Sequence, residues 1–263
     1  MRKPLRWVKP IVLFVGIVVV AAVVGINVFA DSAVRTAIRR AGARALKVPV
    51  NVEKARLSIF SGKLGLETLT VGNPPGYNRP TLLDLSRGDI EIDTKSLLGD
   101  EVRIKDVQLD GMHVFIEQKG LDNNLHEVIR ALPRDQRASG KKLVIDRLEI
   151  TNVTVNVRLL PISGGPDTVA FRLTPIRMTD LGRNERLDVA TLTTKILLAV
   201  ARGIAEQGGG VLPKEMTSGL SGVLDKAVDI GRIIFGSGQN GAGETGRGIT
   251  DGLKSLVRPK GEE

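Results

Sequence analysis

The acidic residues Asp89, Glu91 and Asp93 are the side chains whose type and spacing come nearest to a chemical site. They alternate with Ile90 and Ile92, so on a β-strand the three carboxylates share one face and could collect a cation. Carboxylates at every second position are also typical of the solvent-facing side of an ordinary sheet. The pattern therefore indicates a wet sheet face, and we predict no metal site.

The two histidines, His113 and His126, are too few for a multi-histidine metal site. The sequence has no cysteine, which excludes disulfides, thiolate nucleophiles and Cys-ligated zinc or iron–sulfur clusters. We expect His113 on the strand face opposite to Val114, and His126 exposed beside Glu127. Because no nucleophile, base and orienting group can be assembled from spacing, we predict that the protein is not an enzyme and has no cofactor.

Two glycine-rich segments resemble nucleotide-binding loops without the context that such loops need. Residues 236–241, GSGQNG, match GxGxxG, but the sequence after them is too short for the rest of a βαβ unit. Residues 241–248, GAGETGRG, have Arg247 in place of the P-loop lysine and Gly248 in place of the Ser or Thr that holds magnesium. Both segments are interpreted as a flexible linker.

The composition is that of a folded, mildly basic protein. The 263 residues are 42% hydrophobic and 25% charged, with a net charge of +9, and four basic residues fall in the first nine positions. Aromatic residues make up 3% of the chain, which is a low fraction for a protein that binds nucleic acid by stacking bases on aromatic side chains. We expect no nucleic-acid partner.

The sequence over residues 11–30, IVLFVGIVVVAAVVGINVFA, has no charge and a single polar amide, Asn27. At about 1.5 Å per residue it covers the roughly 30 Å of a bilayer core, so residues 1–30 are predicted to be a membrane anchor. We expect a single pass through a bacterial inner membrane, with the N-terminus cytoplasmic and the body periplasmic. The alternative is a cleaved signal peptide, since Val28 and Ala30 fit a cleavage site before Asp31, but signal cores are usually about 7–15 residues long.

Residues 31–47 follow as a predicted juxtamembrane amphipathic helix, with apolar residues at helical spacing, a cap at Asp31 or Ser32, and Pro49 beyond its end. Two interpretations are open. The helix lies on the membrane with its arginines on lipid phosphates, or it is a solvated arm between anchor and domain. The candidate membrane-surface residues are Arg35, Arg39, Arg40 and Arg44.

Residues 48–182 change to a period of two, which predicts a mainly antiparallel β-sheet. Three segments, 66–73, 104–111 and 145–152, share a unit in which two residues separate the first apolar pair, and the last two lie 41 residues apart. That spacing shifts the period-2 phase and predicts a bend, which makes a sheet curl when it is repeated. An inserted short helix is expected over residues 123–132, with a polar linker over 133–142.

Residues 183–263 are predicted to form amphipathic helices and a flexible glycine-rich tail, which makes the whole an α+β protein. Helical stripes, expected to be packing faces that cap or plug the sheet, are formed by Val189, Leu192, Ile196, Val200 and Ile204, and then by Leu220, Leu224, Ala227, Val228, Gly231 and Ile234.

These features, in this order, resemble the N-terminal region of AsmA-like envelope proteins. The resemblance covers about half of the chain, roughly residues 1–132. Besides the anchor, it lies in Lys47-Val-Pro-Val-Asn-Val52, Leu66-Glu-Thr-Leu-Thr-Val-Gly-Asn-Pro-Pro-Gly76, Ser96-Leu-Leu98, Val102-Arg-Ile-Lys-Asp-Val-Gln-Leu-Asp-Gly111 and the Glu117 to Leu125 stretch, which carries Asn123-Asn-Leu125.

The resemblance implies a strongly bent sheet with an open, apolar groove that holds acyl chains, in proteins tied to outer-membrane lipid supply. The partner expected from it is a phospholipid or another acyl lipid. The alternative is a structural or regulatory scaffold that binds an envelope protein through its sheet edge or helices. An open apolar trough would favour lipid, and a core closed by the C-terminal helices would favour the scaffold. The lipid-groove candidates are Ile90, Ile92, Val114, Ile116, Val153, Val155 and Val157.

Overall fold

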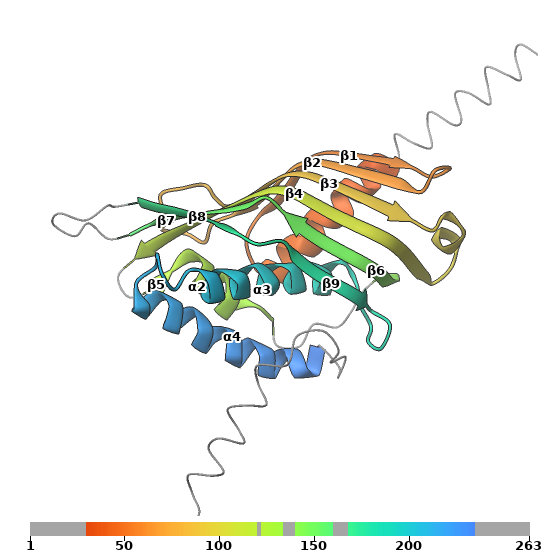
Figure 1. Ribbon diagram of the computed structural model, residues 1–263. Coiled ribbons are helices and arrows are strands. Elements are labelled where there is room, and N and C mark those ends of the chain that lie inside the picture. Colours follow the sequence, from red (N-terminus) through yellow and green to blue (C-terminus); the bar gives the residue numbers. More distant parts are fainter. Residues whose placement is uncertain (1–29, 120–121, 134–139, 160–167, 235–263) are drawn as a thin grey trace, which may run out of the picture.

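The computed structural model describes residues 30–119, 122–133, 140–159 and 168–234, and it is an α+β protein. The strands are β1 (Val50–Ser58), β2 (Lys63–Gly72), β3 (Thr81–Ile92), β4 (Glu101–Lys119), β5 (Asp122–Asn123), β6 (Lys142–Thr151), β7 (Val153–Arg158), β8 (Thr168–Leu173) and β9 (Ile176–Leu181). The helices are residues 30–46, α2 (Asn124–Ala131), α3 (Val189–Gln207), α4 (Lys214–Ile234) and the 3-10 helix η1 (Thr94–Leu98). One curved sheet arches over the helices (Figure 1).

The sheet is mostly antiparallel, as predicted, with one parallel junction. Strands β1 to β4 form an antiparallel meander, and β6 and β7 then pair in parallel with the first and second halves of β4. Strands β9 and β8 pair antiparallel with β6 and β7 and form the far edge. The two repeated units of the sequence lie side by side in the sheet: Ile104 pairs with Ile145 and His113 with Thr154, each pair 41 residues apart. The two units are parallel neighbours, joined by a crossover that contains α2.

Along one line across the sheet, six strand segments each contain one extra residue between two successive side chains that point to the concave face. Inward residues are normally two apart, but on this line they are three apart, and the pairs stand in register. The pairs are Val52 and Ala55, Leu66 and Leu69, Leu85 and Gly88, Leu109 and Met112, Ile150 and Val153, and Leu173 and Ile176. We call this row the bend line.

Backbone geometry marks the bend line. Thr68, Gly111 and Asn152 lie on it with positive φ values of 51°, 71° and 52°. A bend is therefore present as predicted, but only the first unit has the bend line at the predicted spacing, residues 66–69. In the other two units the bend line crosses residues 109–112 and 150–153, at the ends of the units. A second phase shift, at residues 104–107 and 145–148, coincides with a register shift between β3 and β4.

Because the strands shift together, the concave face stays apolar on both sides of the bend line. On each side a row of apolar side chains crosses the sheet from edge to edge. One row is Leu57, Leu64, Ile90, Val107, Leu148 and Met178, and another is Val50, Val71, Leu83, Val114, Val155 and Phe171.

Asp110 ties the two parallel strands together beside the bend. Its carboxylate accepts hydrogen bonds from Thr151 Oγ1 at 2.7 Å and from Asn152 Nδ2 at 2.6 Å. These bonds, the one from Thr151 first, lower the pKa of Asp110 below its usual value. The bend of β6 and β7 is thereby fixed against β4.

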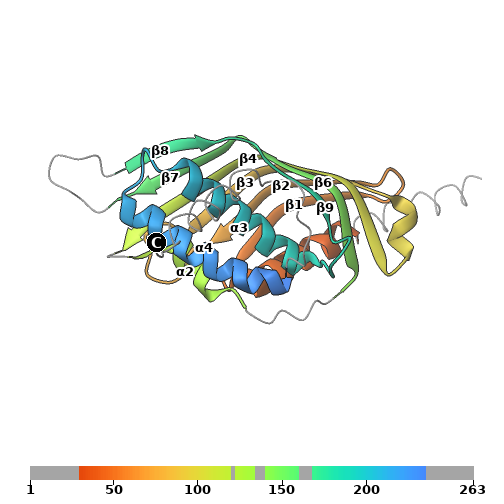
Figure 2. The same ribbon diagram turned by 60° about the horizontal axis from the view of Figure 1, so that its bottom comes forward.

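The helices pack on the concave side of the sheet (Figure 2). Helix α2 begins after Asn123, whose side chain caps it by accepting from His126 N, and it buries Leu125, Val128 and Ile129 as predicted. Helix α3 lies between the sheet and α4 and is buried on more sides than one stripe. Of its predicted stripe Val200 and Ile204 are fully buried, whereas Val189, Leu192 and Ile196 are only partly buried.

Two sequence predictions concern the membrane and the tail. No helix within the described residues is long and apolar enough to cross a membrane. The predicted anchor, apart from Ala30, lies outside the described residues, as do the glycine-rich segments after residue 234.

We predict that Gly111→Ala lowers the free energy of unfolding by about 1–2 kcal/mol, because an L-residue is strained at positive φ. The new Cβ would also lie 3.0 Å from Ser86 Oγ. Urea denaturation of the full chain in mild detergent, followed by circular dichroism, measures the change. The control is Gly65→Ala, since a Cβ at Gly65 meets nothing within 4 Å. Equal effects of the two substitutions would contradict a bend that requires glycine.

The Asp110 carboxylate predicts a pH-dependent contribution to stability. Its pKa is lowered in the folded chain, so the stabilisation is complete above the unfolded value of about 3.9 and is lost as pH falls through the folded value. The urea midpoints of wild type and Asp110→Ala should differ by a constant amount between about pH 7 and pH 5 and converge below about pH 4. A difference that persists undiminished into acid would refute this role.

Candidate functional site: the concave apolar face

The lipid-groove candidates lie on the concave face as predicted, but most of them are completely covered. Val153, Val155 and Val157 are 0% exposed, and Val114 and Ile116 are 1% and 3% exposed. Two further candidates stand nearer the β1–β2 side of the sheet, where Ile92 is buried and Ile90 is only partly buried. An acyl chain therefore has no free access to the central part of this face.

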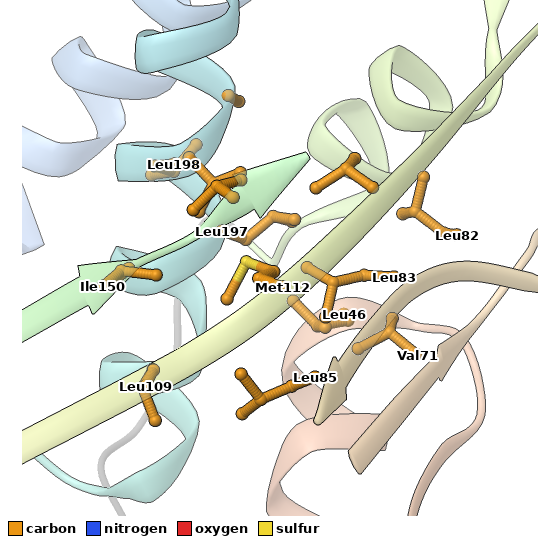
Figure 3. Close-up of a cluster of buried hydrophobic side chains, with 14 of the residues drawn as sticks. Leu46, Val71, Leu82, Leu83, Leu85, Leu109, Met112, Ile150, Leu197 and Leu198 are labelled. Atoms are coloured by element: carbon orange, nitrogen blue, oxygen red, sulfur yellow. The ribbon is translucent and has the colours of Figure 1, made fainter. Parts of the chain in front are cut away.

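Helix α3 and the helix over residues 30–46 close the centre of the concave face. Figure 3 shows Leu46, from the helix over residues 30–46, and Leu197, from α3, reaching the sheet side chains around Met112. On α3, Val200 and Ile204 are 0% exposed. The expected open groove thus differs from the structure: over the described residues the centre is a closed core, filled by α3 and by the helix that precedes β1, with α4 packed on the outer side of α3.

The margins of the apolar face are less completely covered than its centre. Apolar side chains on both outer sides of the sheet are partly buried and pack against the core. They are Leu57, Leu69 and Ile90 on the β1–β3 side, and Val169, Phe171, Ile176, Met178 and Leu181 on β8 and β9. Any acyl contact in this closed form is therefore limited to the two margins.

The helix over residues 30–46 covers the outer edge of β1. Asp31 Oδ1 accepts a hydrogen bond from Leu57 N at 2.6 Å, and Arg35 Nη1 donates to Glu53 O at 3.3 Å. Ala45 and Leu46 at its end are almost fully buried. The interpretation as a solvated arm is therefore wrong, because this helix is part of the domain.

The four candidate membrane-surface arginines differ in position. Arg35 is partly buried against β1, whereas Arg39, Arg40 and Arg44 are exposed. Three of the four candidates are thus exposed on the surface of the domain.

The opposite edge of the sheet is unpaired within the described residues. Strand β8 pairs only with β7, and β9 only with β6, so the outer sides of both strands have no neighbouring strand. The two strands follow one another across the bend line, which falls here at Thr174 and Pro175. One long edge of the sheet is therefore capped, whereas the other, which we call the free edge, has no neighbouring strand within the described residues; on it Gln207 of α3 accepts a hydrogen bond from Thr174 N at 2.9 Å.

The three candidate cation ligands lie on the convex face, and each of them interacts with a neighbouring group of the protein. Asp89 pairs with Arg87 at 3.0 Å and Glu91 with Lys105 at 3.0 Å, while Asp93 caps η1. In the described part of the chain no group of three His, Asp or Glu side chains could hold a metal.

The convex face is polar and ionic. A shallow hollow of about 420 Å³ lies over Gly65, and ion pairs of Glu67 with Lys54 at 3.1 Å and Arg56 at 3.3 Å cross it. His113 is exposed on this face, opposite to the buried Val114, as predicted.

A buried polar cluster, missed by the sequence analysis, holds the loop over residues 73–80 on the end of β4. Glu117 is 6% exposed and accepts from the backbone N–H of Asn78 at 3.0 Å and of Arg79 at 3.3 Å. Asn124 is fully buried and links Asn73 Oδ1 with Phe115 O at 2.8 and 2.7 Å. The only sequence signal was the asparagines in the family-like segments, whose roles need the folded contacts.

The histidine of α2, His126, lies in the same region. It was expected to be exposed, but the structure shows it partly buried. Its side chain is 17% exposed, and His126 Nδ1 lies 2.5 Å from Asp122 Oδ1. Burial raises the pKa of the Tyr77 hydroxyl, and its hydrogen bond to Glu127 adds to the shift. The Tyr77–Glu127 contact joins α2 to the loop, whereas Asp122 of β5 pairs with His126 and, at 2.9 Å, with Arg130 and so holds α2 to the strand before it.

A second buried ionic contact fastens α3 to the segment that leads into it. Lys195 Nζ lies 2.7 Å from Glu185 Oε1, and only 3% of the lysine side chain is exposed. Burial lowers the pKa of Lys195, while the charge of Glu185 acts in the opposite direction. Breaking such a buried pair by removing one partner is costly, so the contact favours α3 in its place on the sheet.

We predict that Tyr77→Phe costs about 0.5–1.5 kcal/mol of stability, since it removes the polar contact of the partly buried Tyr77 hydroxyl with Glu127. In a Glu127→Ala background the same change should cost less than about 0.5 kcal/mol, because the bond is already lost. Urea denaturation of the four chains gives the coupling energy. Additive effects would show that the two side chains do not interact.

Comparison of the chain with models of protein families, with curated proteins and with solved structures found no match in any of the three. The resemblance to AsmA-like proteins therefore stays a prediction from the sequence.

Proposed function

We propose that this protein is a membrane-anchored scaffold of the bacterial cell envelope, with an AsmA-like body that binds another envelope protein. In this proposal residues 11–30 cross the inner membrane, the N-terminus is cytoplasmic and the body is periplasmic. The protein is not an enzyme and needs no cofactor.

The observation that carries the proposal is the closed centre of the concave face. A site for an acyl chain has to be both apolar and accessible. Val155 on the sheet and Val200 on α3 are both 0% exposed in one continuous core. Aliphatic side chains of the protein itself thus occupy the place that an acyl chain needs, and this favours the scaffold over an open lipid conduit.

The free edge formed by β8 and β9 supports a protein partner. An extended segment of another chain can add to an unpaired edge strand through main-chain hydrogen bonds. The edge of β1 is unsuited to this, because Asp31 and Arg35 already bind its backbone groups. Pro175 and the bend divide the free edge into two short segments, so a partner strand has to bend at the same place.

Acyl-chain binding is the second candidate, and the partly covered margins favour it. Phe171 and Met178 continue the apolar rows onto the free edge with part of their surface exposed. A lipid tail that lies along this margin shields apolar surface without opening the core.

In-cell photo-crosslinking tests the proposal, with one photoreactive residue at a time in the full chain. Positions Ala170 and Thr179 report on the free edge, and Glu53 on the capped edge is the matched control. We expect a single protein species to be attached at Ala170 and Thr179 and none at Glu53. Attachment at all three positions, or at none, would contradict partner binding through this edge.

Two concave-face positions separate the scaffold from the lipid function. A photoreactive residue at Val114 reports on the closed core, and one at neighbouring His113 faces the other way. The scaffold predicts no lipid adduct at either position by mass analysis. Lipid adducts at Val114 but not at His113 would show that the core opens to acyl chains and would replace the scaffold with lipid handling.

A further inference from the structure

Two large apolar side chains protrude from one end of the sheet. Within the described residues the large apolar side chains with high exposure are Leu98 at 95%, Phe60 at 78% and, in the connection between α3 and α4, Val211 at 43%. Single exposed apolar residues are ordinary on protein surfaces, but a group at one place marks an interaction site. Phe60 and Leu98 form such a group if the turns that carry them are neighbours.

Phe60 and Leu98 lie in neighbouring turns. Phe60 is in the turn between β1 and β2, and Leu98 is the last residue of η1, between β3 and β4. The backbone joins the two turns, since Ile92 N donates to Gly62 O at 2.7 Å just before η1 begins. Figures 1 and 2 show both turns at the same end of the sheet.

The predicted membrane segment leads to this same end. Its last residue, Ala30, is the first described residue of the helix over residues 30–46, and the next residue, Asp31, accepts a hydrogen bond from the backbone N–H of Leu57 at 2.6 Å. Leu57 is near the end of β1 and stands three positions before Phe60. A bilayer crossed by residues 11–30 therefore has to begin beside the two protruding side chains.

The charges around the two turns suit a membrane interface. Lys63, Lys95 and Lys141 are exposed, and Lys141 Nζ donates to Leu97 O at 2.6 Å beside Leu98. Lysine stems can lie along apolar surface while their ammonium groups reach phosphates.

The acidic groups at this end leave little net charge. Glu101 pairs with Lys142 at 2.8 Å, and the Asp93 side chain accepts from Lys95 N at the start of η1, while Asp100 is exposed. The small net charge means that the apolar side chains, and not a basic patch, have to supply the contact.

We infer that this end of the sheet is a membrane-contact surface, in which Phe60 and Leu98 insert into the interfacial layer of the bilayer that holds residues 11–30. The inference rests on the membrane anchoring in the proposed function and is independent of whether the body binds a protein or a lipid. It fixes the orientation of the body: the β1–β2 and η1 turns face the membrane, and the start of α4 points away from it.

The absence of cysteine allows a direct test with the full chain. The variants Phe60→Cys, Leu98→Cys and Val211→Cys each receive one environment-sensitive nitrobenzoxadiazole label and are reconstituted in phosphatidylcholine and phosphatidylglycerol vesicles that contain spin-labelled lipid. Val211 is the matched control, because it is also an exposed aliphatic residue but lies in the α3–α4 connection at the far end of α3.

We expect blue-shifted emission at residues 60 and 98 and quenching of at least about twofold by the spin-labelled lipid, with neither at residue 211, because only an inserted label meets the acyl boundary. Water-like emission at residues 60 and 98 in chains that float with the vesicles would overturn the contact surface and leave the anchoring intact. Equal quenching at all three positions would also overturn it, because the contact would then be nonspecific. Chains that fail to float with the vesicles would overturn the anchoring itself.

Discussion

The shared phase shift along the bend line is the constraint on which the rest of the structure depends. If β4 kept a strict period of two after Leu109, its inward positions would be Gly111, His113, Phe115 and Glu117 in place of Met112, Val114 and Ile116. One face would then change from apolar to polar halfway along the strand. Each of the six strand segments has to carry its extra residue at the same register position, and positive φ values at Thr68, Gly111 and Asn152 accommodate it on three of them.

The bend also determines where the helices can pack. A sheet that curves encloses a space on its concave side, and the apolar rows that line this space need cover from water. The crossover between the parallel strands β4 and β6 supplies α2 at one end, and the helix over residues 30–46 covers the β1 side. Helix α3 fills the remaining centre and is buried on several sides, because α4 packs against its back.

Local features of the fold could be predicted from the sequence, because they depend on neighbouring residues. A bend in the sheet and the helices over residues 31–47 and 123–132 could be predicted from periodicity, although the predicted cap at Asp31 or Ser32 was wrong for Asp31, because residue 30 is already helical and the Asp31 carboxylate binds Leu57 N. The parallel pairing of residues 104–110 with 145–151 could not be predicted, since period-2 alternation looks the same in parallel and antiparallel strands.

Burial by residues that are distant along the chain could not be predicted from the sequence either. A stripe on α3 indicates one packing face, but its second face is decided by α4, and the burial of Glu117 depends on a loop nearly forty residues away along the chain. The groove candidates were placed on the correct face, because alternation along a strand determines the direction of each side chain. The same alternation gives no information on which helices cover that face, so the burial of the candidates could not be predicted.

The energetics of opening the core explain why the closed form favours a scaffold. Moving α3 away from the sheet exposes Leu197, Val200 and Ile204 among others, at a cost of about 1.5–3 kcal/mol for each large aliphatic side chain. A phospholipid taken from a bilayer offers little to offset this, because its acyl chains are already out of water before they bind and gain no further hydrophobic transfer energy. Phe60 and Leu98 are in the opposite situation, since they are in water on the body and gain that energy when they enter a membrane. The same hydrophobic term therefore opposes extraction of lipid into the closed body and favours attachment of its exposed end to the lipid surface.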